Sequence, residues 1–371
     1  MKVICTTKDL FQGVQVAGRA VSARSSLPIL GHLLIRSEGD KLRIAATDLE
    51  IGMECAVPAS VQEEGSLTVP AKIFTEVLGA LPEADVALSV DESNTTTIKC
   101  GTSEYTILGL PPEEFPMLPE VKEEASFSVG KSTLRNAIRK TRFAVSQDES
   151  RARLTGIMTS ITDSTIRLVS TDTYRLCVYD FTATEAAGQT QVIIPGKAMA
   201  ELERILGDEE GQVQAAISKT QVLFTVDDTL LVSRLIEGQF PDYDRVIPKE
   251  HNRKLTIPTE QLLTGVKRAS IVARESTYKI VTRTSDDKLI ITAETGGIGR
   301  AYEEVDVVRE GEDIEIAFNA KFLGEFLDAV SDTGDEAIEM QIAGALNATL
   351  MKPSGGSGEE SYTYVLMPVQ L

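Results

Sequence analysis

Apolar positions follow two periods along the chain, and these predict amphipathic helices alternating with half-buried strands. Leu134 and Ile138 lie one helical turn apart, and the run 197–207 repeats the spacing with Met199, Leu202, Ile205 and Leu206. Segments such as "KLRIAATD", "TIKCGTSEYTILGL" and "QVLFTVDDTLLVSRLI" alternate apolar and polar residues, as strands with one buried face do. We therefore expect helices that each bury one face against antiparallel sheet.

The pattern occurs three times. A helix opening is shared by "TTKDLFQGVQVAGRAVS" from Thr6, "GKSTLRNAIRKTRFAVS" from Gly130 and "PTEQLLTGVKRAS" from Pro258. A strand leading into a helix recurs with lysines at 72, 197 and 321, which are 125 and 124 residues apart. Matches at nearly constant spacing indicate an internal repeat. The predicted fold class is α+β, with two helices packed on antiparallel sheet in each of three domains, at residues 1–121, 122–249 and 250–371.

A hairpin is the third repeated marker, with "RIAATDLEIG", "RLVSTDTYRL" and "IITAETGGIG" at corresponding places. The first two copies share a Thr-Asp pair, Thr47-Asp48 and Thr171-Asp172, which is therefore predicted to serve the scaffold. The run 173–176, Thr-Tyr-Arg-Leu, occurs in the middle copy alone, and we expect it to bind a partner.

Composition limits the classes of protein that fit. The 371 residues include no run of 18 apolar residues, and the N-terminus lacks the apolar core of a signal peptide. The four cysteines are isolated, which favours buried thiols in a reducing cytoplasm over disulfides or a zinc site. The net charge of −19 disfavours indiscriminate coating of nucleic acid, yet it allows a basic stripe on one face.

A local basic excess interrupts this acidic chain at residues 131–153. Arg135, Arg139 and Arg142 have the spacing of one helix face, which predicts either a solvated basic surface or a site for an anion. The corresponding parts of the other repeats supply Arg19, Arg24, Lys267 and Arg268, which favours one extended anionic partner. No aromatic residues interleave with these cations, so we expect contacts to phosphates and no base stacking.

Enzyme interpretations have little support in the sequence. "ASFSVGKST" resembles a phosphate-binding loop, but Ala125 stands where that motif needs glycine, and the repeat makes the segment a strand entering a helix. "TGGIG" at 295–299 falls on a hairpin turn, and neither His32 nor His251 has a catalytic or metal-ligand setting. We expect no catalytic residues, no metal and no cofactor.

Six collinear motifs nevertheless resemble one known family along the whole chain. They are "SLPILGHLLI" (26–35), "TVPAKIF" (68–74), "SQDESRARLTGI" (146–157), "STDTYRL" (170–176), "GQFPDYDRVIP" (238–248) and "YVLMPVQL" (364–371). The chain resembles the beta subunit of bacterial DNA polymerase III, the sliding clamp. The resemblance implies a head-to-tail homodimer, a ring of six domains around duplex DNA that tethers the replicative polymerase. It also implies a non-catalytic processivity factor that works in the cytoplasm without a membrane partner, and that binds the clamp loader and polymerases through short linear motifs.

The resemblance also assigns residues to three surfaces. The DNA-binding positions it implies are Arg24, Lys72, Gln147, Arg151, Arg153, Lys197 and Arg204. A peptide pocket between the second and third domains is expected from Leu154, Thr171, Thr173, Tyr174, Arg175, Leu176, Pro241, Arg245, Val246, Leu346, Ala348, Val365, Leu366, Met367 and Pro368. The implied dimer interface joins Tyr105, Ile107 and Leu108 of the first domain to Ile271 and Val272 of the third. The chain departs from the usual family pattern at Ala152, Arg153, Asp244 and Gln370.

Domain size independently favours a ring of two subunits. A domain of this length has a diameter of roughly 35 Å, so three in a ring leave a hole about 5 Å wide and six leave about 35 Å. Only the larger hole admits a duplex about 20 Å across. Two other interpretations stay open at this point, a peptide-binding scaffold that has lost DNA function and an enzyme that acts on a phosphorylated substrate.

Overall fold

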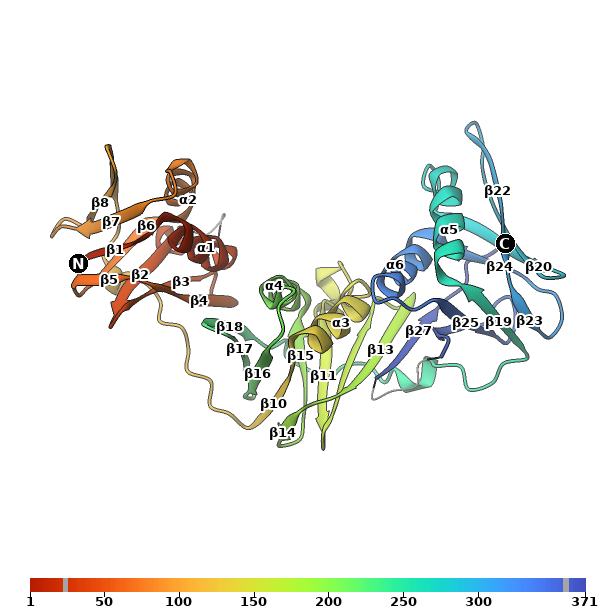
Figure 1. Cartoon of the computed structure of the whole chain (residues 1–371). Coiled ribbons are helices and arrows are strands. Elements are labelled where there is room, and N and C mark those ends of the chain that lie inside the picture. Colours follow the sequence, from red (N-terminus) through yellow and green to blue (C-terminus); the bar gives the residue numbers. More distant parts are fainter. Residues whose placement is uncertain (23–25, 356–359) are drawn as a thin grey trace. The chain divides into compact units, whose positions relative to one another are not determined.

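The computed structural model describes residues 1–22, 26–355 and 360–371 (Figure 1). The chain packs as two compact units, residues 1–131 with 204–235 and residues 132–203 with 236–371. The middle repeat thus contributes to both units. The boundaries 1–121, 122–249 and 250–371 concern the repeats, and they stay a prediction. No helix in the described ranges is long and apolar enough to cross a membrane.

The first unit is built from two antiparallel sheets and the packed helices α1 and α2. One sheet has the strand order β5-β1-β7-β8-β9, and the other contains β10-β16-β17-β18-β4-β3-β2-β6. The helices are α1 (Thr7–Ala17) and α2 (Ala71–Ala80), with short 3-10 turns η1 (Gly18–Ala20), η2 (Pro28–Gly31) and η3 (Pro112–Glu114). The strands are β1 (Lys2–Thr6), β2 (His32–Glu38), β3 (Lys41–Thr47), β4 (Ile51–Pro58), β5 (Ser60–Glu63), β6 (Ser66–Pro70), β7 (Asp85–Val90), β8 (Thr95–Cys100), β9 (Ser103–Leu108), β10 (Ala125–Gly130), β16 (Gln212–Ile217), β17 (Gln221–Val226) and β18 (Thr229–Arg234).

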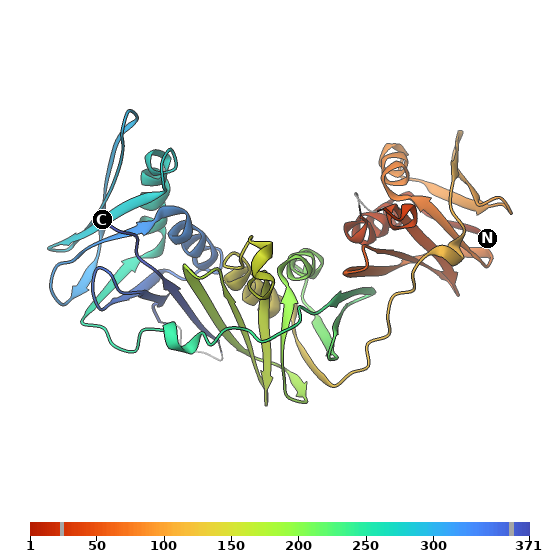
Figure 2. The same ribbon diagram turned by 180° about the vertical axis from the view of Figure 1, so that it is seen from behind.

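The second unit also has two sheets, with strand orders β15-β11-β12-β13-β27-β26-β25-β19-β23 and β22-β21-β20-β24. Helices α5 and α6 lie side by side, and the β21–β22 hairpin extends beyond its sheet (Figure 2). The helices are α3 (Lys131–Arg142), α4 (Gly196–Leu206), whose last turn belongs to the first unit, α5 (Thr259–Ala273) and α6 (Ala320–Ser331), with 3-10 turns η4 (Glu149–Leu154) and η5 (Asp244–Val246). The strands are β11 (Gly156–Thr162), β12 (Thr165–Thr171), β13 (Arg175–Thr182), β14 (Glu185–Ala187), β15 (Thr190–Pro195), β19 (Arg253–Pro258), β20 (Lys279–Ser285), β21 (Lys288–Thr295), β22 (Gly299–Asp306), β23 (Val308–Glu310), β24 (Glu315–Asn319), β25 (Ala337–Ile342), β26 (Thr349–Pro353) and β27 (Ser361–Leu366).

The structure confirms the repeated succession of elements. Strand enters helix at β1–α1, β10–α3 and β19–α5, and again at β6–α2, β15–α4 and β24–α6. Lys72, Lys197 and Lys321 are each the second residue of their helix. The apolar positions paired by the repeat, such as Leu134 and Ile138, are buried, so the predicted helix faces do pack against the sheets.

Neighbouring repeats are joined by backbone pairing. In the first unit β4 pairs antiparallel with β18, with Thr229 opposite Cys55. In the second unit β13 pairs antiparallel with β27, with Leu176 opposite Val365. Each ladder continues a sheet from one repeat into the next and satisfies backbone donors and acceptors that would otherwise lie along an open edge.

The two Thr-Asp turns are built alike. The Thr47 hydroxyl donates to the carbonyl of Ile51 (2.9 Å) and accepts from the amide of Leu49 (3.0 Å). The Asp48 carboxylate accepts from the amides of Glu50 (3.0 Å) and Ile51 (2.7 Å). In the middle repeat the Thr171 hydroxyl likewise donates to the Arg175 carbonyl and accepts from the Thr173 amide, and the Asp172 carboxylate accepts from the amides of Tyr174 and Arg175. The pair therefore belongs to the scaffold, as the repeat predicts.

Two motifs that resembled chemistry have structural roles. β10 runs directly into α3 at Lys131, whose side chain is buried and forms an ion pair with Asp227 at 2.5 Å. The glycine-rich run 295–299 is the turn between β21 and β22, where Gly297 has a φ of 78°. All four cysteines are buried free thiols, as expected.

A buried carboxylate links three neighbouring strands of the third repeat. Glu339 on β25 is 2.7 Å from the Lys254 ammonium on β19 and 3.2 Å from that of Lys352 on β26. The Gln341 amide also donates to it, at 2.5 Å. Burial works against the charged carboxylate, but these partners lower the pKa of Glu339 to about 2.

Replacing Glu339 with Gln is expected to lower the free energy of unfolding at pH 7 by roughly 1–3 kcal/mol. Because the folded pKa is depressed, the stabilisation is fully present above the unfolded pKa of about 4.3 and is lost as the pH falls towards 2. Urea unfolding of both proteins between pH 7 and pH 3 measures this difference. A stability gap that stays constant with pH would contradict the ionic role of Glu339.

Candidate functional site

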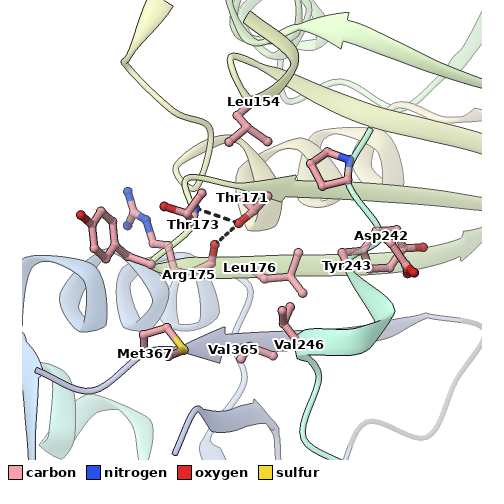
Figure 3. Close-up of a pocket in the computed structure, with 12 residues that line it drawn as sticks. Leu154, Thr171, Thr173, Arg175, Leu176, Asp242, Tyr243, Val246, Val365 and Met367 are labelled. Atoms are coloured by element: carbon pink, nitrogen blue, oxygen red, sulfur yellow. Dashed lines mark hydrogen bonds between the residues drawn. The ribbon is translucent and has the colours of Figure 1, made fainter. Parts of the chain in front are cut away.

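An apolar pocket opens in the second unit, next to the ladder that joins the middle and third repeats (Figure 3). It encloses about 200 Å³. Its lining residues are Leu154, Thr171, Thr173, Tyr174, Arg175, Leu176, Pro241, Asp242, Tyr243, Val246, Val365 and Met367.

The floor of the pocket is part of a hydrophobic core cluster. Leu176 on β13 and Val365 on β27 face each other across the ladder and are buried. Leu154, at the end of η4, covers the same cluster, and Tyr243 packs against it from the segment before η5. Because the floor is held by both sheet pairing and core packing, the pocket is preformed in the free chain.

The rim is apolar and exposed. Tyr174, Val246 and Met367 have exposed fractions of 61%, 54% and 42%. Large hydrophobic side chains that are exposed to solvent around a concavity are typical of binding sites, where a ligand buries these side chains.

The Thr-Asp turn forms one side of the pocket. The Thr171 hydroxyl donates to the Arg175 carbonyl (2.6 Å) and accepts from the Thr173 amide (3.1 Å), as the dashed lines in Figure 3 mark. Thr173 has a φ of 81°, an uncommon conformation for a residue with a Cβ. Its hydroxyl receives a further bond from the Arg151 guanidinium at 3.1 Å.

Arg175 is a buried structural cation. Its guanidinium bonds to the Asp172 carboxylate (2.9 Å), the Phe143 carbonyl (2.6 Å) and the Glu325 carboxylate, and lies 4.3 Å from the centre of the Phe322 ring. Burial opposes the charge, but the acidic neighbours outweigh it and raise the pKa of Arg175 above its ordinary value. Since the Asp172 and Glu325 carboxylates already neutralise the guanidinium, Arg175 contributes to the pocket by fixing the shape of the turn.

Most of the expected peptide-binding residues meet in this pocket. Ten of the fifteen line it, and the five that do not are Arg245, Leu346, Ala348, Leu366 and Pro368. Ala348 packs against the same core cluster, and Arg245 forms an ion pair with Asp242 at 2.6 Å on the outer rim. Leu366 is wholly buried, because side chains alternate along β27 and its neighbour Val365 faces the pocket.

Asp242 and Tyr243 line the pocket and were missed. Both lie inside the motif "GQFPDYDRVIP", between two residues that the resemblance did assign. Their position between Pro241 and Arg245 was the available signal.

The expected DNA-binding residues are distributed over both units. Gln147 and Lys197 line one polar cavity of about 760 Å³ in the second unit, together with Arg142. Arg151 and Arg153 are exposed on η4, while Lys72 on α2 and Arg204 near the end of α4 are exposed in the first unit. Arg24 lies outside the described residues.

The basic excess at 131–153 is smaller in the structure than in the sequence. Lys131 and Lys140 are buried, and Lys140 pairs with Asp335 at 3.0 Å. Arg139 and Arg142 both bond to Glu203, at 3.0 and 2.9 Å. Acids distant in the sequence therefore offset part of the predicted basic face, while Arg139 and Arg142 stay at the surface, and contact of this face with an anion stays a prediction.

The expected interface residues differ in exposure. Tyr105 and Leu108 on β9 are 39% and 69% exposed, and Ile271 near the end of α5 is 57% exposed. Val272 is half-buried, whereas Ile107 is 8% exposed and packs inside the first unit. Of the three residues on β9, Tyr105 and Leu108 are the ones available to another chain.

Comparison with known proteins identifies the same family in each repeat. Residues 1–119 match the N-terminal domain of the DNA polymerase III beta subunit, residues 128–242 its central domain and residues 244–370 its C-terminal domain. Together these matches cover nearly the whole chain.

Relatives match the chain from end to end. The beta sliding clamp of Staphylococcus aureus is 33% identical over 362 residues, which cover 95% of this chain and 94% of the relative. A sliding clamp structure from Bacillus subtilis is 28% identical, with a TM-score of 0.94 and coverage of 100% of this chain and 99% of the other. A Pseudomonas aeruginosa clamp, solved bound to griselimycin, is 29% identical with a TM-score of 0.93 and full coverage of both chains. The chain belongs to the DNA polymerase III beta subunit family, the beta sliding clamps.

Proposed function

We propose that this chain is a sliding clamp that encircles duplex DNA and tethers the replicative polymerase, so that it confers processivity without catalysing a reaction. The end-to-end match to a beta sliding clamp carries the proposal. The ring is a head-to-tail homodimer of six domains that works in the cytoplasm. The clamp loader and the polymerases bind through short linear motifs.

Two open sheet edges support closure by strand addition. In the described part of the chain β9 and β22 are each the last strand of their sheet, with one paired neighbour. Such edges present free amides and carbonyls to a partner strand. Tyr105 and Leu108 lie on β9, and α5, which carries Ile271, is tied to β22 by the Arg268–Glu303 ion pair at 2.6 Å. In the proposed ring, β9 of each copy pairs with β22 of the other, so that two copies make the contact twice.

Long, exposed polar side chains suit the proposed DNA surface. Lys72, Gln147, Arg151, Arg153, Lys197 and Arg204 are all exposed, and Arg24 is assigned on the resemblance alone. Contacts from such side chains to phosphates hold a duplex without reading its bases, so a ring can slide. The net charge of −19 keeps the remaining surface unattractive to DNA.

The apolar pocket suits the partner peptides. Its buried floor of Leu154, Leu176 and Val365 suits aliphatic or aromatic side chains, and its exposed apolar rim offers further contacts to the peptide. Partners that use one small pocket must exchange in turn, as a clamp loader and a polymerase do.

The protein loaded on a nicked circular plasmid is expected to stay bound through gel filtration and to be released once the circle is cut, because a ring slides off a free end. A monomer at micromolar concentration that never remains on circles would contradict the clamp and leave a peptide-binding scaffold without DNA function.

Replacing Leu108 with Glu is expected to raise the dimer dissociation constant at least about tenfold, because it sets a carboxylate against the acidic edge strand β22, which carries Glu303 and Glu304. Sedimentation velocity over a dilution series measures the constant. Leu346→Glu is the matched control, since Leu346 is 75% exposed and is not an assigned interface residue. Equal behaviour of the two variants would remove β9 from the interface.

Replacing Met367 with Ala is expected to weaken a labelled peptide with one aliphatic and one aromatic anchor by about 1–2 kcal/mol, with the thermal midpoint unchanged, because Met367 is at the exposed rim. Leu366→Ala is expected to cost about 2–5 kcal/mol of folding stability, because Leu366 is fully buried. Fluorescence anisotropy and thermal melts separate the two effects. Unaltered affinity in Met367→Ala would exclude Met367 from the binding site.

A further inference from the structure

The first unit contains a second apolar pocket, which the proposed function does not use. It encloses about 320 Å³ and is lined by Leu27, Pro28, Ile29, Leu30, Leu49, Leu110, Glu114 and Pro116. Seven of these eight described residues are apolar, and the eighth, Glu114, is acidic.

Two walls of this pocket correspond to walls of the peptide pocket. Leu30 matches Leu154, because the carbonyl of each accepts a bond from the serine that follows the first helix of its repeat, Ser22 at 3.0 Å and Ser146 at 2.8 Å. Both leucines are buried in the local core. Leu49 matches Thr173, as the third residue of the Thr-Asp turn.

The remaining wall also corresponds. Pro116 and Pro241 each line their pocket and each follow a buried phenylalanine, Phe115 and Phe240. The fold has therefore produced the same concavity in two repeats, with different side chains at the rim.

Leu49 is an exposed apolar residue in a costly backbone conformation at the rim of the first pocket. Its φ is 76°, a left-handed conformation that is costly for a leucine and cheap for glycine or asparagine. Its side chain is 45% exposed, so core packing does not require it. An apolar side chain kept at a strained, exposed position beside a pocket suggests contact with a ligand.

The acidic residues at this pocket favour a ligand with a basic group. Glu114 lines the pocket, Glu113 beside it is exposed, and the described lining residues include no lysine or arginine. We propose that this pocket binds a short peptide segment that inserts an aliphatic side chain between Leu30 and Leu49 and places a neighbouring lysine or arginine against Glu114. This second site is independent of the peptide pocket in the second unit.

The test uses the full chain and two labelled octapeptides, one with adjacent leucines followed by two lysines and one with glutamates in place of the lysines. Both are titrated by fluorescence anisotropy into the Val246→Arg variant, whose added cation at the rim of the other pocket disfavours the lysine peptide there. The lysine peptide is expected to bind at least about tenfold more tightly than the glutamate peptide.

Leu49→Gly is expected to weaken the lysine peptide at least about tenfold, while the thermal midpoint stays the same or rises, because glycine adopts the positive φ without strain. Thr173→Gly, the same change at the corresponding turn, is the matched control and is expected to leave this binding unaltered. Glu114→Gln is expected to weaken the lysine peptide about three- to tenfold and not to weaken the glutamate peptide, because the change removes attraction for lysine and repulsion of glutamate.

Three results would overturn the proposal: equal binding of the two peptides, unaltered binding in Leu49→Gly, or an equal loss in Thr173→Gly. A change of oligomeric state in Leu49→Gly would also overturn it and would assign the pocket to contact between copies of the chain.

Discussion

Antiparallel pairing between repeats is the interaction on which the rest of the structure depends. A strand at the edge of one repeat has free amides and carbonyls, and the next repeat satisfies them with an edge strand of its own. The β4–β18 ladder does so in the first unit and the β13–β27 ladder in the second. Each ladder thereby pairs the edges that it joins, and β9 and β22, which both lie at the end of a sheet in the described part of the chain, are the edge strands proposed to pair between copies.

The same ladders place the binding surfaces. Because Leu176 faces Val365 across β13 and β27, the junction of two repeats brings apolar side chains from distant parts of the sequence to one floor. The turn that begins β13 supplies the adjoining wall, and Arg175 holds that turn to helix α6 through Glu325. A pocket built in this way is as rigid as the sheet beneath it. Such a preformed pocket suits the proposed exchange of linear motifs.

Repetition of the fold does not mean repetition of the chemistry. The first and middle repeats share the Thr-Asp turn atom for atom, and they share the leucine and proline walls beside it. Thr173 and Leu49 occupy one position in that turn and give their pockets different rims. The hydrogen bonds that both turns share, between the Thr and Asp side chains and the backbone, set the shape of the concavity. The side chains that take no part in these bonds determine what the concavity can bind.

The sequence by itself determined the repeated succession of elements and the faces that the helices bury, because these depend on local periodicity and on constant spacing. Ten of the fifteen residues that the family resemblance assigns to a peptide pocket do line one pocket in the structure. The tertiary structure decided which charges are available, since Lys131, Lys140, Arg139 and Arg142 meet Asp227, Asp335 and Glu203 from distant segments. It also decided that Leu366 and Ile107 point inward. The identity of a residue shows whether it is apolar or charged. Only its neighbours in the folded chain determine whether that side chain is buried or paired within the molecule or is exposed to a partner.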